Sequence, residues 1–152
     1  MRSEHLATPE AFDAFLRGFE LGTLPKSEWT HGAHVAAAAN YLFDSDVKTV
    51  LPLMRTRISA YNLAVGGANT PSSGYHETLT RFWLLIVAEF LRQRQSEDRP
   101  KTRLDAARQA LEIFGEARSL HTLYYSGDVV KDSAARTAWR PPDLIPLPDI
   151  QV

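Results

Sequence analysis

Apolar residues recur along this chain at intervals of three and four, and the alternation typical of β-strands is nearly absent. Residues 8–22 give a clear pattern, in which the apolar positions share one helical face: Phe12, Phe15, Leu16 and Phe19. Thr8 precedes a proline and an acidic residue, which is typical of a helix N-terminus, and Gly22 can end the helix. The pattern predicts a helix here and an all-α fold for the chain.

The same spacing, together with capping residues, predicts further helices over residues 30–43, 45–67, 75–95 and 104–114. A short sixth helix is expected within 116–125 and a last helical turn within 132–139. Ser45 is the expected cap of the third helix, which Pro52 should kink or divide. The fourth helix is the most apolar segment, so we expect it at the centre of the fold.

Prolines after residue 140 exclude regular helix at the end of the chain. A length of 152 residues suits one domain, and no repeat or linker divides it. We therefore predict a single up-down bundle of about five to six helices over residues 1–152. Residues 140–152 are predicted to form an extended tail that packs on the bundle through its apolar side chains: Leu144, Ile145 and Leu147.

Composition excludes several classes of function. The formal net charge is −1 and the basic residues form no stripe, so we expect no nucleic-acid partner. No segment approaches the ~18 apolar residues of a membrane span, and no signal segment is evident, which predicts a cytoplasmic protein without a membrane partner. The chain has no cysteine, so any metal must take nitrogen and oxygen ligands.

Three of the five histidines stand at the start of two apolar helices. His31 and His34 are three residues apart and share the inward face of the second predicted helix. His76 heads the inward face of the fourth. Helices joined by short loops alternate in direction, so the second and fourth should run parallel if Pro52 does not fold the third into a hairpin. The sequence thus predicts that three imidazoles converge at one end of the bundle.

Such a cluster needs partners, because a buried polar group left unpaired costs ~1–3 kcal/mol. A divalent ion held by His31, His34 and His76 would supply them, and zinc, iron, nickel or copper would suit imidazole. The positive ends of the helix dipoles favour neutral imidazole, the form that binds a metal. His121 or a carboxylate is a candidate fourth ligand. Helix capping and backbone hydrogen bonds are the competing explanation of each histidine.

Residues beside the histidines have similar alternatives. Glu77 is the predicted catalytic base, although it could also be a ligand, support one, or stabilise the helix start by pairing with Arg81. Thr80 could bind substrate or hydrogen-bond a carbonyl of its own helix. Trp29 and Tyr75, which precede the two histidine motifs, are predicted pocket walls, with a hydrophobic staple as the alternative.

The motifs W-T-H-x-x-H and Y-H-E-T, followed by AARTAWRPPDLIPLP, resemble an uncharacterised family of small bacterial helical proteins. The resemblance runs from Trp29 to Pro148. It implies that His31, His34 and His76 act as one unit, and it implies no particular reaction.

From these features we predict a small metal-dependent enzyme, of hydrolase or lyase type, that acts on a small polar molecule. One alternative is a metal-free helical module in which the histidines and helix N-termini bind a small molecule or anion. Another is a structural or partner-binding bundle whose histidines only cap helices. The apolar breadth of the fourth helix is compatible with a homodimer interface and with a central core position.

Overall fold

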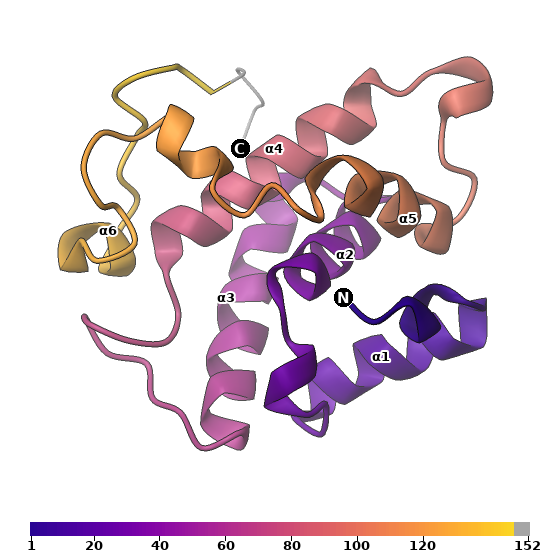
Figure 1. The fold of residues 1–152 in the computed structure, drawn as a ribbon, viewed down its shortest axis with the longest axis horizontal. Coiled ribbons are helices and arrows are strands. Elements are labelled where there is room, and N and C mark those ends of the chain that lie inside the picture. Colours follow the sequence, from indigo (N-terminus) through magenta and orange to yellow (C-terminus); the bar gives the residue numbers. More distant parts are fainter. Residues whose placement is uncertain (148–152) are drawn as a thin grey trace.

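The periodicity of the sequence is realised as helices throughout residues 1–147, the part of the chain that the computed structural model describes (Figure 1). The α-helices of this range are α1 (Pro9–Leu21), α2 (His31–Leu42), α3 (Val47–Ala64), α4 (Glu77–Gln93), α5 (Arg103–Phe114) and α6 (Ser133–Thr137). Short 3-10 helices lie between or beside them: η1 (Ser3–Leu6), η2 (Lys26–Glu28), η3 (Ser96–Asp98) and η4 (Leu120–Leu123). The described residues form no β-strand, and the all-α prediction is confirmed.

Helix starts follow the local capping chemistry. The Thr8 and Thr30 hydroxyls accept hydrogen bonds from backbone N–H groups in the first turns of α1 and α2, at 3.1 and 3.3 Å. The cap of α3 is Asp46 and not Ser45, and its carboxylate accepts from the N–H of Thr49. Pro52 does not divide α3, because it lies early in the helix and removes only one donor from the hydrogen-bond ladder.

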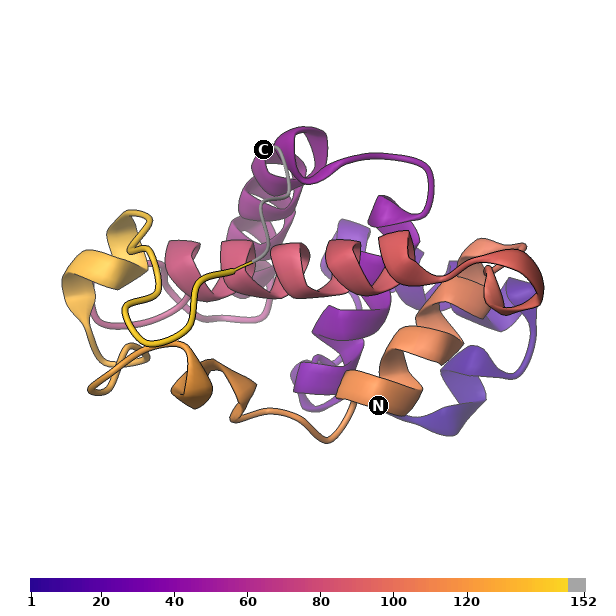
Figure 2. The ribbon, with the colours of Figure 1, turned by 90° about the horizontal axis from the view of Figure 1, so that it is seen from above.

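Helix α4 occupies the centre, as its composition predicts, and contacts α2, α3, α5 and α6 (Figure 2). One part of its apolar surface enters the main core through Leu84, Leu85 and Val87. Another part forms a second, smaller core with the C-terminal segment, which we define as residues 115–147. The buried members of that second core are Phe82, Ile86, Tyr125, Val129 and Ala135. A wide apolar stripe is therefore needed because α4 is covered from two directions.

The main core depends on the close approach of α2 and α5. Small side chains of both helices are buried at their contact: Ala33, Ala36, Ala37, Ala106, Ala107 and Ala110. Because alanine adds only one carbon beyond the backbone, the two helices pack tightly while each retains a strong helix propensity.

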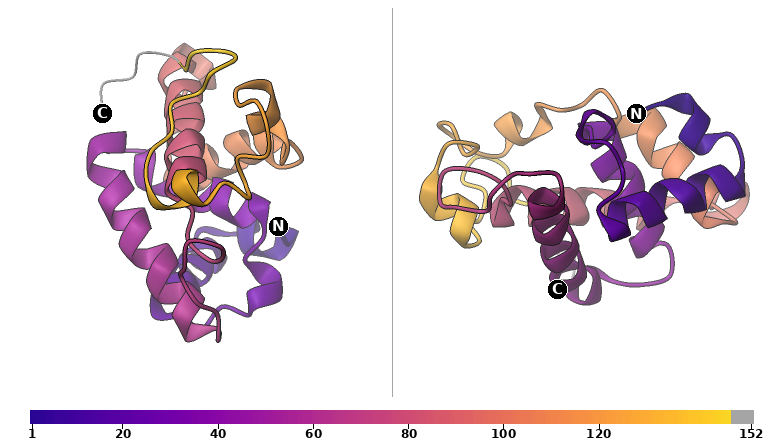
Figure 3. Two further views of the ribbon diagram at one scale, coloured as in Figure 1. Left: turned by 90° about the vertical axis from the view of Figure 1, so that its left-hand side faces the viewer. Right: turned by 90° about the horizontal axis from the view of Figure 1, so that it is seen from below.

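Within the C-terminal segment, η4 lies beside α4 on the side opposite α3, and α6 lies near the start of α4 (Figure 3). Hydrogen bonds join it to the start of α4: the Thr78 hydroxyl donates to the carbonyl of Ala138 and accepts from the N–H of Arg140, both at 2.9 Å. The Arg136 guanidinium donates to the carbonyl of Gly74 at 2.7 Å. These bonds fix the segment where it can form one wall of a site.

The predicted packing of the C-terminal tail is only partly realised over residues 140–147. Leu147 is half-buried and contacts both cores, whereas Leu144 and Ile145 are exposed. Backbone N–H groups of Asp143 and Leu144 bond to the carbonyl of Tyr124, at 3.1 and 3.0 Å, and so hold the tail in place. Residues 148–152 of the predicted tail lie outside the described residues. Within the described chain, no helix has both the length and the hydropathy to cross a membrane.

Two glycines with left-handed backbone allow a test of the packing between α1 and α3. Gly22 ends α1 with φ 73°, and a Cβ added there would lie 2.5 Å from the Cβ of Ala64. Gly66 has φ 88°, but an added Cβ would meet nothing within 4 Å. We expect Gly22→Ala to lower the free energy of unfolding by about 2–4 kcal/mol and Gly66→Ala by about 1 kcal/mol, because only the first adds a clash to the backbone strain. Urea denaturation followed by circular dichroism measures both.

The double variant Gly22→Ala/Ala64→Gly is the matched control. It should recover most of the difference between the two single variants. Equal losses in Gly22→Ala and Gly66→Ala would show that the α1–α3 contact is looser than described.

Candidate functional site

The two histidine motifs meet at one pocket of about 600 Å³, a volume typical of small-molecule sites. Helices α2, α3 and α4 and the C-terminal segment all contribute to its walls. The lining includes most residues that the sequence singles out: Trp29, His31, His34, Tyr75, His76, Thr80 and His121. Glu77 is not in the lining.

His31 is the first residue of α2, and its ring packs edge-on against Trp83 with centroids 4.7 Å apart. Its Nε2 lies 3.0 Å from the carbonyl oxygen of Phe114. A carbonyl only accepts hydrogen bonds, so Nε2 carries the proton and Nδ1 keeps a lone pair. Burial lowers the pKa of His31, partly offset by the bond to Phe114.

His34 has the opposite tautomer. Its Nδ1–H donates to the carbonyl of Thr30, one turn earlier, at 2.9 Å, so Nε2 keeps the lone pair. The ring lies against Trp29 with centroids 4.1 Å apart, and Trp29 in turn stacks on Phe19 at 4.1 Å. Burial lowers the pKa of His34 to about 4, so the imidazole is neutral at pH 7.

His76 is buried and uses both of its ring nitrogens to hold the backbone. It is the N-cap of α4: Nδ1 accepts from the N–H of Leu79 at 3.1 Å. Nε2–H donates to the carbonyl of Val129, in the C-terminal segment, at 2.9 Å. Burial lowers the pKa of this imidazole as well. His76 therefore lines the pocket but offers it no free nitrogen.

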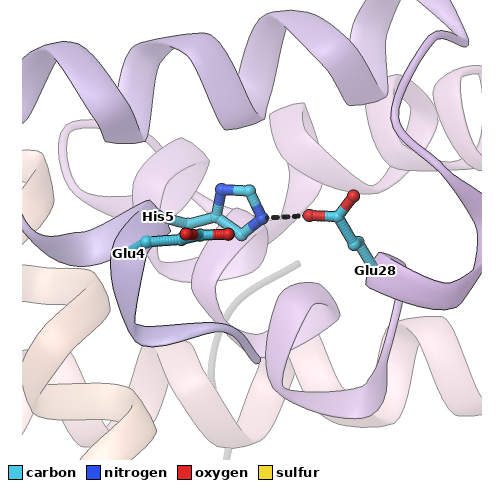
Figure 4. A group of neighbouring side chains, drawn as sticks. All are labelled: Glu4, His5 and Glu28. Atoms are coloured by element: carbon cyan, nitrogen blue, oxygen red, sulfur yellow. Dashed lines mark hydrogen bonds and ion pairs between the residues drawn. The ribbon is translucent and has the colours of Figure 1, made fainter.

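This geometry does not fit a metal centre built from His31, His34 and His76 together. A metal would need a lone pair that His76 spends on capping α4. Within residues 1–147, the group of three ligand side chains whose atoms lie within 4.8 Å of one another is Glu4, His5 and Glu28 (Figure 4). The divalent metal at His31, His34 and His76 stays a prediction.

Glu4, His5 and Glu28 have an explanation without a metal. The His5 Nε2 lies 2.7 Å from Glu28 Oε1, and its half-buried ring packs on Phe15. Arg2 pairs with Glu4 at 2.8 Å and with Glu28 at 3.5 Å, so its guanidinium contacts both carboxylates and offsets part of their charge. The group ties the N-terminal η1 to η2, on the approach to α2.

Glu77 lies behind the pocket wall, where its carboxylate binds Arg55 of α3 at 2.8 and 2.7 Å. It also accepts a hydrogen bond from the hydroxyl group of Tyr75, at 2.8 Å. The hydrogen bonds from Arg55 and Tyr75 hold the pKa of Glu77 below its usual value despite partial burial. Glu77 is thus placed to orient Tyr75, and this arrangement does not favour its predicted role as a base. Its partner is Arg55 rather than Arg81.

Some lining residues were not found from the sequence. Met54, Ile58 and Asn62 are four residues apart on one face of α3, so helical spacing was an available signal. Arg118 precedes η4 in an irregular segment, and nothing in the sequence pattern marks it. Trp83 of α4 is half-buried, packs against the main core and also lines the pocket.

No family model matches the chain, and neither the curated proteins nor the solved structures contain a significant match to it. The resemblance based on the two histidine motifs stays a prediction. The pocket is therefore the feature of this protein that indicates a function.

The hydrogen bonds predict a distinct tautomer for each pocket histidine. We expect His34 to be protonated on Nδ1, and His31 and His76 on Nε2, because each of these nitrogens faces a carbonyl oxygen. Long-range ¹H–¹⁵N correlation spectra at pH 7.5 distinguish the two neutral forms. A rapidly exchanging tautomer mixture at His34 would contradict the assignment.

The lowered pKa values predict a loss of stability in mild acid. The unfolded chain binds a proton at His34 near the ordinary pKa of 6.5, and the folded protein only near 4. The contribution of neutral His34 to the free energy of unfolding is therefore fully present above pH 6.5. It falls by about 2–3 kcal/mol as the pH decreases towards 4. His31 and His76 act in the same direction. Urea denaturation at pH 7.5, 6.5 and 5.5 should give a falling free energy of unfolding, with a shallower slope in His34→Gln. A constant value across this range would refute the buried neutral state.

Proposed function

We propose that this protein binds a small, largely apolar organic molecule in the pocket without a metal ion. The volume of about 600 Å³ suits such a ligand. Aromatic rings and apolar side chains provide most of the wall: Trp29, Ala38, Met54, Ile58, Tyr75, Leu79, Trp83 and Leu84. Burial of the ligand against these groups would supply the main driving force for binding.

The division of roles among the three histidines carries the proposal. His76 spends both ring nitrogens on the backbone, so it builds the pocket. His31 and His34 each spend one nitrogen on a carbonyl, and the other nitrogen has no hydrogen-bond partner among residues 1–147. Two neutral imidazoles in a largely apolar wall would provide placed polar groups that orient a ligand.

A metal-dependent enzyme of hydrolase or lyase type is the second candidate. The free nitrogens of His31 and His34 are neutral, the form that binds a divalent ion. Such a site would need a further ligand. His121, whose imidazole can bind a metal, is the candidate in the pocket lining. The cytoplasmic location and the homodimer stay predictions that neither candidate requires.

Calorimetry on metal-free protein separates the two candidates. With EDTA-treated full-length protein we expect indole to bind and to raise the melting temperature, because its flat apolar body matches the aromatic walls. Zinc chloride should bind no tighter to the wild type than to His31→Ala. Tight zinc binding that His31→Ala abolishes, with no binding of indole, would favour the metal-dependent candidate.

Filling the pocket tests its location. Ala38 lines the pocket, and Ala38→Leu should weaken indole binding at least tenfold by occupying the space. Ala14, exposed on α1, provides the matched control, and Ala14→Leu should bind indole like the wild type. Thr80→Leu serves as a second filling variant should Ala38→Leu fail to fold. Unchanged affinity in both filling variants would place indole elsewhere.

A further inference from the structure

Three of the polar groups that line the pocket, which also include Asn62, Thr80 and His121, are fixed as hydrogen-bond acceptors. His31 Nε2 and His34 Nδ1 donate to carbonyl oxygens, which leaves each ring one nitrogen with a lone pair. The Tyr75 hydroxyl donates its proton to Glu77, so its oxygen too can only accept. We call His31, His34 and Tyr75 the acceptor set.

The acceptor set cannot easily be reversed. A tautomer change at either histidine would turn a lone pair towards a carbonyl oxygen and lose the hydrogen bond. Burial keeps both imidazoles neutral, and Glu77 stays ionised because Arg55 binds both of its oxygens. Trp29 Nε1–H is a buried donor without an acceptor among the described residues, and it is not part of the acceptor set.

The formal charge in the pocket lining has one sign. Arg118 contributes a guanidinium, and no carboxylate lines the pocket among the residues that the structure describes. The Arg118 side chain is exposed and forms no salt bridge within residues 1–147, so it is available to an anionic group at the solvent side. A guanidinium pairs well with a carboxylate.

From these features we infer that the pocket selects small organic acids whose apolar body carries an N–H or O–H donor. The carboxylate pairs with Arg118, and the donor bonds to the free nitrogen of His31 or His34. The inference rests on the proposed function and adds the ligand's chemical class. The inference also predicts which ligands bind weakly. A ligand without a donor leaves the buried acceptors unpaired, and a cationic ligand is repelled by the guanidinium of Arg118.

Three related probes test the two halves of this inference by calorimetry on the full chain. Indole-3-acetate has both the acid and the N–H, 1-methylindole-3-acetate lacks the N–H, and indole-3-acetamide lacks the charge. We expect indole-3-acetate to bind most tightly. The methylated probe should bind about tenfold more weakly at any salt concentration, and the amide about fivefold more weakly at low salt only.

Variants assign each preference to its residue. Arg118→Gln should give the acid and the amide equal affinity. Arg17 is an exposed arginine of α1, and Arg17→Gln should leave the affinities of all three probes unchanged. His34→Phe or His31→Phe should reduce the difference between the N–H and N-methyl probes. Equal binding of all three probes to the wild type would overturn this inference and leave the proposed function standing. Failure of all three and of indole to bind would overturn both.

Discussion

The structure depends on one buried, neutral imidazole that is satisfied at both nitrogens. His76 caps α4 through Leu79 and binds the carbonyl of Val129, 53 residues later in the chain. The same ring therefore starts the central helix and attaches the C-terminal segment to it. A charged imidazole could not do this, because its Nδ1 would become a donor facing another donor. Burial, by keeping the ring neutral, preserves both bonds.

This attachment explains the composition of α4. A helix that packed only on a bundle would need one apolar face, whereas α4 meets the main core with one set of residues and the C-terminal segment with another. The pocket lies near the start of this helix, and α2, α3 and the C-terminal segment also line it. Among its polar groups, one nitrogen each of His31 and His34 has no hydrogen-bond partner in the described chain, and the oxygen of Tyr75 can accept.

Features set by neighbours in sequence were predictable. The caps at Thr8 and Thr30 and the end of α1 at Gly22 follow from side chains that reach only their own turn. Ser45 and Asp46 can both cap a helix, so the choice between them depended on packing. The helical faces predicted that His31, His34 and His76 point inward, and all three line one pocket.

Features set by distant partners were not predictable. The i+4 rule paired Glu77 with Arg81, but Arg55 approaches from another helix and forms two hydrogen bonds. The carbonyls of Phe114 and Val129 decide which histidine nitrogens are free, and they lie 83 and 53 residues from their partners. Sequence patterns could therefore indicate where the imidazoles gather but not which of their atoms remain available.

The C-terminal segment gives the pocket a wall that does not belong to helices α1–α5. Within residues 115–147, the α-helix is the short α6. The segment joins α4 through a small core and through hydrogen bonds such as those of Thr78 and Arg136. A unit held in this way detaches at a lower free energy than the main core unfolds. The residence time of the proposed ligand would then depend on the lifetime of these attachments, while α2 and α5 stay packed.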